Sequence, residues 1–346
     1  MSPRLHPVLR VIFEGVYDHG SSFANLRGTP HILKIIWKYI TGYWKSLIKI
    51  GTKSVMPTYG MDSVTPKIVP QDKFVIRVHK VTFPTPQNIN INMMPFIMGN
   101  DFNSCHLPQY LHTYWKKFIF PLMHSYSASA ELEEGKICFL TIQESHVSHN
   151  QTQRRPGLHT ENPGKIMIEE ECTTSQGIGS FDEKHHGGKG SSTVRFYDHH
   201  WGRGIKQGKR DKVQGGIYMA SNVENSCMVW NSQVQCDGNN HDMEIIRRHG
   251  DIEYLRPYIG TSTLMKHDVI YWITDRTPHE SLPLTKDAYR QYFRLVTHQV
   301  SLWFEDHSTK NPLGIVPDPN ITKIVKGSKF GDPFQLKVIS DVKKYE

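Results

Sequence analysis

The chain has 346 residues, of which 38% are hydrophobic and 11% aromatic, and it carries a net charge of +8 with its histidines neutral. This composition can build a core in one or two domains, and it excludes an intrinsically disordered chain. The positive charge permits attraction to nucleic acid, anionic lipid or acidic substrates but selects none of them. No run of about 18 apolar residues occurs, so we expect no spanning helix.

The five cysteines are an odd number, widely spaced, with no Cys-x-x-Cys pair. That pattern excludes a disulfide framework and a zinc ribbon. The N-terminus also lacks the uninterrupted apolar core of a signal peptide. We therefore expect an intracellular, cytoplasmic protein.

The N-terminal third contains one clear helix signal. Thr29-Pro30 supplies a capping hydroxyl and a proline at the first helical position, and apolar residues recur at helical spacing from Ile32 to Ile50. Lysines gather on another side of this predicted helix. It either packs on its own domain, as amphipathic surface helices usually do, or contacts a membrane surface or a partner.

Several strands and one further helix are predicted along the rest of the chain. Residues 88–92 resemble a loop, and Pro95 argues against a central strand there. The aromatic-rich stretch 109–124 predicts a short helix whose aromatic residues belong to the core. The predicted strands cover residues 74–79, 136–144, 215–223, 226–230, 268–274 and 289–297.

Residues 163–214 interrupt this pattern with glycine, serine, lysine and histidine. Between two strands of a compact barrel this stretch would be a long insertion, and such loops are commonly lids or binding loops. We expect a lid over a site. The paired histidines of the insertion are the alternative, as a second metal site.

The strongest chemical signal joins two distant motifs, Arg155-Pro-Gly-Leu-His-Thr-Glu161 and Arg276-Thr-Pro-His-Glu-Ser281. In an extended strand His159 and Glu161 project from the same side. His279 follows the predicted strand 268–274, and Pro278 places it at a strand end. Two histidines and one carboxylate on one face of a metal select non-haem Fe(II) for oxygen chemistry.

Basic residues accompany both motifs. Arg290 and Arg294 share one face of the strand 289–297, where a planar guanidinium could hold a carboxylate through two hydrogen bonds. Arg154 and Arg155 form a positive cluster just before His159. They are either an anion-binding lip over the metal, or surface arginines paired with Glu131, Glu133 or Glu134.

The order His-x-Glu, distant His, then Arg eleven or fifteen residues later resembles the 2-oxoglutarate and Fe(II)-dependent oxygenases. The resemblance covers roughly residues 136–304. It implies a double-stranded β-helix, or jelly roll, in which His159, Glu161 and His279 bind iron. It further implies that Arg290 binds the distal carboxylate of 2-oxoglutarate, with Arg294 as an alternative anchor or a contact to an anionic substrate group.

A competing His-x-Asp motif lies at His249-Gly250-Asp251. It is too close to His279 to leave room for the intervening jelly-roll strands, and residues 251–256 have helical spacing. We therefore favour His159 and Glu161.

The sequence thus predicts an α+β, mainly β fold, with a jelly-roll, cupin-like core and flanking helices. Residues 1–130 would pack on a core formed by 131–305, and 306–346 would be a C-terminal extension. The expected function is an Fe(II)- and 2-oxoglutarate-dependent oxygenase acting on a small molecule or a protein side chain. The alternative is a non-catalytic jelly roll used for binding or assembly. Nucleic-acid binding is not indicated, because no basic stripe is interleaved with stacking aromatics.

Overall fold

A computed structural model of the chain describes residues 67–70, 75–125, 133–161, 164–171, 192–207, 212–235, 246, 248–330 and 337–338. The chain divides into two compact units, Met1–Thr65 and Pro66–Glu346, and all described residues belong to the second. The amphipathic helix predicted for residues 32–50 lies outside the described residues. The division at residues 130 and 305 stays a prediction.

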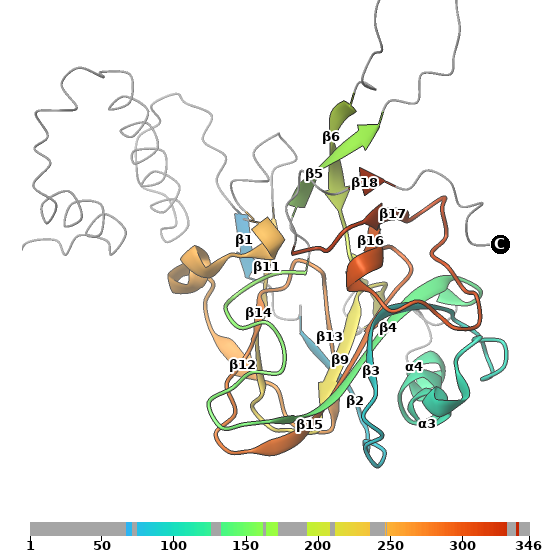
Figure 1. The fold of residues 1–346 in the computed structure, drawn as a ribbon. Coiled ribbons are helices and arrows are strands. Elements are labelled where there is room, and N and C mark those ends of the chain that lie inside the picture. The colour runs from blue at the N-terminus through green and yellow to red at the C-terminus, as the bar shows by residue number, and fades with distance from the viewer. Residues whose placement is uncertain are drawn as a thin grey trace, which may run out of the picture. The chain divides into compact units, whose positions relative to one another are not determined.

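A six-stranded antiparallel sheet forms the centre of the second unit (Figure 1). In order across the sheet its strands are β2 (Ile76–Lys80), β13 (Val269–Ile273), β9 (Ile217–Ser221), β15 (Ala288–Val296), β4 (Ile137–Val147) and β3 (Asn90–Ile97). Each of them except β3 coincides with a predicted strand. The mainly β prediction is therefore confirmed.

Strand β3 corrects one expectation. The loop predicted at residues 88–92 is wrong from Asn90 onward, because β3 begins there and pairs with β4. Pro95 lies inside β3, which forms the edge of the sheet. An edge strand tolerates proline because one of its two sides needs no ladder donor.

A smaller antiparallel sheet consists of β12 (Ser262–Leu264), β10 (Cys227–Trp230) and β14 (His279–Ser281). His159 extends it by one residue, since its backbone pairs with His279 on one side and with Asp251 on the other. The regular strand expected at His159 is wrong: the pairing there is an isolated bridge. It still holds the two predicted motifs side by side.

The remaining strands form three further sheets. These are β1 (Lys67–Pro70) with β11 (Ser232–Gln235), β7 (Ile205–Gln207) with β8 (Lys212–Gln214), and a five-stranded sheet of β16 (Leu302–Phe304), β17 (Lys323–Lys326), β18 (Lys337–Val338), β5 (Gly164–Glu171) and β6 (Ser192–His199). The stretch 163–214 therefore contains paired strands, and its residues 172–191, with His185 and His186, lie outside the described residues.

The helix predicted at residues 109–124 is present, although irregular. It runs through a 3₁₀ turn η2 (Gln109–Leu111), α3 (His112–Tyr114), a π turn η3 (Trp115–Ile119) and α4 (Phe120–Ser125). Further 3₁₀ turns are η4 (Arg248–Gly250), η5 (Glu253–Tyr258) and η6 (Glu305–His307). None of the helices in the described part of the chain has the length and apolar character needed to cross a bilayer.

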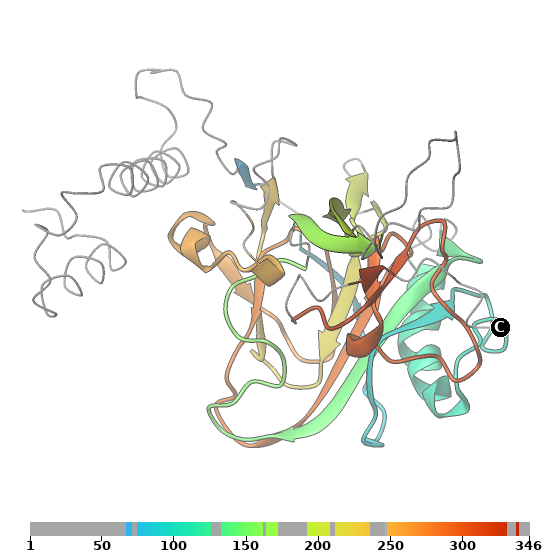
Figure 2. The same ribbon diagram turned by 45° about the horizontal axis from the view of Figure 1, so that its top comes forward.

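The six-stranded sheet separates two hydrophobic clusters, and helices α3 and α4 lie on its opposite side from β12 and β14 (Figures 1 and 2). Strand alternation on β15 directs Phe293 to the helix side, where its ring centroid lies 4.6 Å from that of Phe118. Arg290, Tyr292 and Arg294 point to the other side. The same alternation that builds the core therefore also places both predicted arginines on one face.

One buried carboxylate ties the helix to the sheet. The Oε1 atom of Glu144 accepts hydrogen bonds from the Tyr114 hydroxyl at 2.7 Å and from Gln291 Nε2 at 2.9 Å. Its Oε2 atom accepts from the backbone nitrogens of Gln87 at 2.7 Å and Ile89 at 3.0 Å. Each of the two carboxylate oxygens thus has two donors, as burial of a charged group requires.

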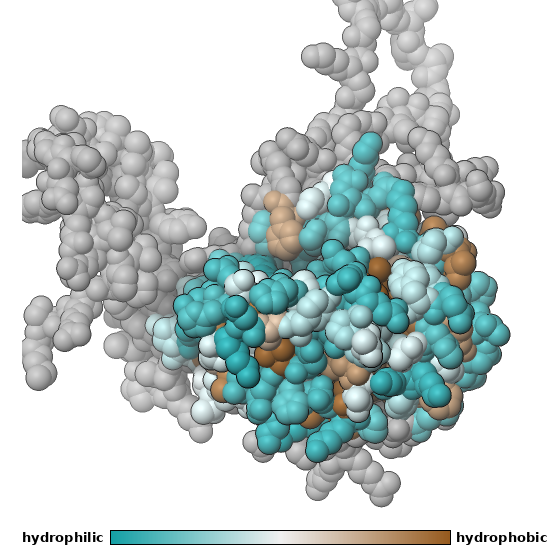
Figure 3. Space-filling model, turned by 60° about the horizontal axis from the view of Figure 1, so that its bottom comes forward, coloured by the Kyte–Doolittle hydropathy of each residue, from teal (hydrophilic) through white to brown (hydrophobic). Residues whose placement is uncertain are grey.

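The outer surface carries scattered apolar residues. The face drawn in Figure 3 is mostly hydrophilic, with hydrophobic residues in small separate spots. Tyr110 and Phe120 of the aromatic helix are among the exposed ones, at 46% and 37% of their surface, while Tyr114 and Phe118 are buried. The predicted aromatic core is thus correct for one side of the helix, and single exposed apolar residues are ordinary.

Gly216, at the start of β9, gives a test of the packing around β13. A Cβ there would lie 2.2 Å from Trp272 Nε1, and the residue has a φ of +95°. We expect Gly216→Ala to destabilise the protein by about 1–3 kcal/mol more than the backbone strain alone, because the crowded atoms belong to a packed indole. Urea denaturation measures the difference.

Gly260→Ala is the matched control, since Gly260 has a φ of +77° with nothing within 4 Å of the added Cβ. It should lose only the roughly 1–2 kcal/mol of a left-handed alanine. Equal losses in the two variants would contradict the packing argument.

Candidate functional site

A pocket lies between the six-stranded sheet and the smaller sheet, and all five predicted site residues line it. They are His159, Glu161, His279, Arg290 and Arg294. The other lining residues are Asn92, Arg154, Arg155, Trp201, Cys227, Ser281, Tyr292, His307, Lys329 and Phe330. Residues far apart in the sequence therefore meet at one point.

His159 and His279 are joined to each other through their main chains. Their main chains exchange two hydrogen bonds of 3.0 and 2.9 Å, and their ring centroids lie 4.4 Å apart. Each ring is fixed in the same way: Nδ1 of His159 lies 2.7 Å from Gly157 O, and Nδ1 of His279 lies 2.9 Å from Thr277 O. A ring nitrogen facing a carbonyl carries a proton, which in a neutral imidazole leaves the lone pair on Nε2.

Both imidazoles are buried, with 9% and 5% of the surface of His159 and His279 exposed. Burial lowers the pKa of His159 well below its ordinary value, and the neighbouring His279 lowers it further. His159 is therefore neutral at pH 7. A neutral imidazole with Nδ1 held by a carbonyl is the form in which histidine ligates metals.

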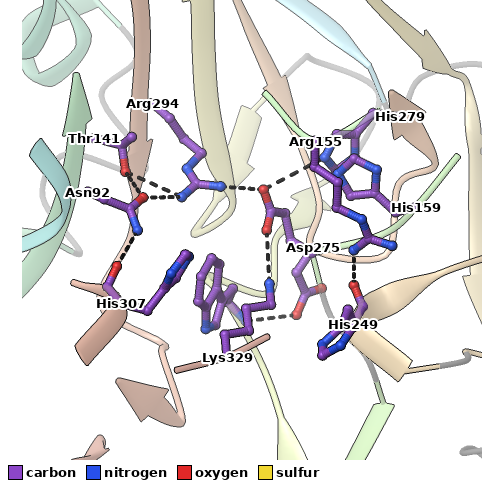
Figure 4. A network of polar contacts seen from close by, with 12 residues as sticks. Asn92, Thr141, Arg155, His159, His249, Asp275, His279, Arg294, His307 and Lys329 are labelled. Atoms are coloured by element: carbon purple, nitrogen blue, oxygen red, sulfur yellow. Dashed lines mark hydrogen bonds and ion pairs between the residues drawn. The ribbon is translucent and has the colours of Figure 1, made fainter. Parts of the chain in front are cut away.

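Glu161 lies beside this pair and is surrounded by positive charge. Arg294 Nη1 donates to its Oε1 atom, His279 Nε2 lies 3.7 Å from the same oxygen, and Lys329 Nζ lies 3.6 Å from Oε2. These contacts are the dashed lines that meet between Arg294, His279 and Lys329 in Figure 4. Burial alone would raise the pKa of Glu161, but Arg294, His279 and Lys329 hold it well below its usual range.

The three predicted ligands converge without forming a ready ligand cage. Among the residues that the structure describes, no group of three or more histidine, cysteine, aspartate or glutamate side chains is arranged to hold a metal ion. The oxygens of Glu161 are instead engaged by Arg294 and Lys329. Two imidazoles and a carboxylate are donors that suit a divalent metal, but the carboxylate of Glu161 is already paired with Arg294 and Lys329.

Each arginine of β15 has one buried nitrogen without a hydrogen-bond partner among the described residues, Nη2 of Arg290 and Nε of Arg294, but the two side chains differ in what they pair with. Arg294 Nη1 donates to Glu161, and its Nη2 lies 3.3 Å from Thr141 Oγ1. Arg290 is fully buried, and within the described part of the chain its side chain donates to two hydroxyls, Ser221 Oγ and Ser281 Oγ, each at 3.2 Å.

The Nη2 atom of Arg290 has no hydrogen-bond partner among the described residues. A buried donor left without an acceptor is costly. Burial lowers the pKa of Arg290 without removing the charge at neutral pH. An anionic ligand in the pocket would supply the missing acceptor.

Arg154 and Arg155 lie at a shallower level of the same pocket and are both half-buried. Arg154 Nη1 donates to Gln143 Oε1 at 2.9 Å, and Arg155 Nη1 donates to the carbonyl of His249. The predicted pairing with acidic residues before β4 is wrong for two of them. Glu133 pairs instead with His298 at 2.6 Å, and Glu134 contacts Asn100. Glu131 lies outside the described residues.

The competing His249-Gly250-Asp251 motif does not enter the site. His249 has a left-handed backbone with φ 64°, and neither it nor Asp251 lines the pocket. Asp251 Oδ1 accepts from the backbone nitrogen of Glu253 at 2.9 Å, at the start of η5. The helical spacing that argued against this motif corresponds to η5.

Among the lining residues that sequence reasoning missed, four come from stretches outside the predicted core strands: Trp201, His307, Lys329 and Phe330. They come from the insertion and from the C-terminal extension. Lys329 Nζ lies 4.0 Å from the centroid of the Trp201 ring, and Phe330 packs against the rings of His249 and His307. No motif marks them, because only the folded chain brings these segments to the pocket.

Comparisons with protein-family models, with curated proteins and with solved structures gave no match for this chain. The function is therefore argued from the pocket itself.

Glu161→Gln tests whether the buried carboxylate stabilises the fold. It would leave Arg294 and Lys329 buried without a counter-charge, and removing one member of a buried ion cluster costs about 3–5 kcal/mol. We expect a loss of that size in urea denaturation.

Glu253→Gln is the control, since the Glu253 and Arg256 side chains are 50% and 38% exposed and their ion pair is at the surface. The expected loss is below about 1 kcal/mol. A Glu161→Gln loss no larger than the control would show that solvent or ions already compensate the cluster.

Proposed function

We propose that this protein is an Fe(II)- and 2-oxoglutarate-dependent oxygenase, with a hydroxylase as the leading form. The observation that carries the proposal is the His159–His279 pair. Two buried imidazoles meet across one backbone bridge, with both Nδ1 atoms held by carbonyls and a carboxylate 3.7 Å from one Nε2. Such second-layer hydrogen bonds orient histidines that ligate metals.

The proposal includes a double-stranded β-helix as the core. Along the chain the pairing alternates between the larger and smaller sheets: β4, the bridge at His159, β9, β10 and β12, β13, β14, and finally β15. Four of these segments belong to each sheet. A jelly roll consists of two such antiparallel sheets, with the site between them, and this alternation supports that assignment.

In this proposal His159, His279 and Glu161 would hold iron, which together with a 2-oxo acid would supply the oxidising chemistry. The residues of the chain supply the geometry. Gly157 and Thr277 orient the two rings through their Nδ1 atoms, and Arg294 and Lys329 compete for Glu161. The buried walls exclude water from the reacting centre.

Arg290 is the proposed partner of the far carboxylate of 2-oxoglutarate. Arg290 lines the pocket together with His279 and Ser281, and its Nη2 has no hydrogen-bond partner among the described residues. A guanidinium holds a carboxylate bidentately, and this one is prealigned by Ser221 and Ser281. Arg294 is the weaker candidate because it already pairs with Glu161.

A second candidate is a non-catalytic protein that binds an anion in this pocket. The observation that favours it is the ion cluster of Glu161 with Arg294 and Lys329, which satisfies the carboxylate without a metal. In that case Arg290 would still bind an anion, and the histidines would serve packing alone. Metal titration separates the two candidates.

Titration of the metal-free protein with Fe(II) under anaerobic conditions tests the ligand set. We expect one ion per chain, and an affinity loss of more than about 100-fold in His159→Ala or His279→Ala, since losing a ligand exceeds the 10–100-fold effect of an outer partner. His267→Ala is the control, because that side chain is 53% exposed and remote from the pocket. Unchanged affinity in both site variants would favour the anion-binding candidate.

Release of succinate from 2-oxoglutarate tests the role of Arg290. Arg290→Gln should raise the KM for 2-oxoglutarate about 10- to 100-fold, the effect of losing one or two charge-assisted hydrogen bonds. Its iron affinity should stay near wild type. An unchanged KM in Arg290→Gln together with a raised KM in Arg294→Gln would assign the anchor to Arg294.

A further inference from the structure

The charge of the pocket exceeds what the proposed reaction needs. Five cationic side chains line it, and Glu161 is its sole carboxylate among the described residues. The cations are Arg154, Arg155, Arg290, Arg294 and Lys329. Like charges gathered in a partly buried space repel one another, so an arrangement of this kind favours a bound anion.

The proposed metal and cosubstrate leave this excess in place. Fe(II) would add two positive charges, and 2-oxoglutarate would add two negative ones. Glu161 is engaged by Arg294 and Lys329, and Arg290 would take the cosubstrate. Glu161 attracts Arg154 and Arg155 across the pocket, but among the described residues no carboxylate forms an ion pair with either of them.

These two arginines form an outer level of the pocket. Arg290 and Arg294 are 0% and 1% exposed, whereas Arg154 and Arg155 are half-buried. The Tyr292 ring contacts both levels: its centroid is 5.1 Å from the Arg154 guanidinium and 5.6 Å from that of Arg290. Neither Arg154 nor Arg155 forms an ion pair with a carboxylate of the described chain; their neutral acceptors are Gln143 Oε1 and His249 O.

The segment that carries both arginines is fixed to the strands below it. Gln153 Nε2 lies 3.0 Å from Arg290 O, 3.0 Å from Ser145 Oγ and 3.3 Å from Gln143 O. Strands β15 and β4, which build the deep wall, therefore also position the outer arginines. A guanidinium held through one nitrogen still offers other donors, so the pair is preorganised for an oxyanion.

We propose that the substrate of this site carries an oxyanion group, of the phosphate, sulfate or carboxylate kind, which Arg154 and Arg155 bind at the outer level of the pocket. The identification of the bound molecule as a substrate rests on the proposed oxygenase function. The anion subsite itself does not, since it depends only on the arginines and their neighbours.

Calorimetric titration of the full chain with inorganic phosphate and with sulfate, without metal or 2-oxoglutarate, tests the subsite. We expect both probes to bind, with at least a ten-fold weaker affinity in the Arg154→Gln/Arg155→Gln double variant. The Arg77→Gln/Lys80→Gln variant removes the same charge from exposed positions on β2 and should bind as wild type. Arg154→Lys/Arg155→Lys keeps the charge and should retain part of the affinity, which separates binding from misfolding.

A competition arm distinguishes the outer level from Arg290. Saturating 2-oxoglutarate should leave phosphate binding in place, because the two anions occupy different arginines. Full displacement, absence of binding by either probe, or equal affinities in the two double variants would each overturn the proposal. If the protein does not bind Fe(II) but still binds phosphate, the oxygenase proposal is wrong and the anion-binding pocket remains.

Discussion

The backbone bridge between His159 and His279 is the contact on which the site depends. It joins two motifs that are far apart in the sequence, and it extends the smaller sheet by one residue. Since both residues exchange backbone hydrogen bonds, the relative position of the two imidazoles is set by main-chain geometry. The carbonyls of Gly157 and Thr277 then fix the ring orientation.

Burial and neighbouring charges have opposite effects on the ionisation of Glu161. Burial disfavours an ionised carboxylate, and the surrounding cations keep it ionised. Those same cations are what a metal would have to compete with for the carboxylate. A buried ion cluster of this kind is costly to break. A metal that took Glu161 as a ligand would have to displace this ion cluster.

The two faces of β15 have different roles: one packs against the aromatic helix, and the other lines the pocket. On one face Phe293 and Gln291 pack against the aromatic helix and Glu144. On the other face Arg290 and Arg294 enter the pocket. A one-residue slip of this strand would exchange the two sets, so the packing of the helix also specifies the position of the arginines.

The sequence by itself determined the mainly β class, most strands of the central sheet, and the five residues that line the pocket together. Those features follow from the alternation of apolar and polar residues along strands and from the spacing of motifs, both of which can be read from the sequence. Only the tertiary structure placed Lys329 beside Glu161 and the Trp201 ring beside Lys329. It also revealed that His159 pairs through an isolated bridge, because non-local contacts depend on how distant segments pack and leave no periodic trace in the sequence.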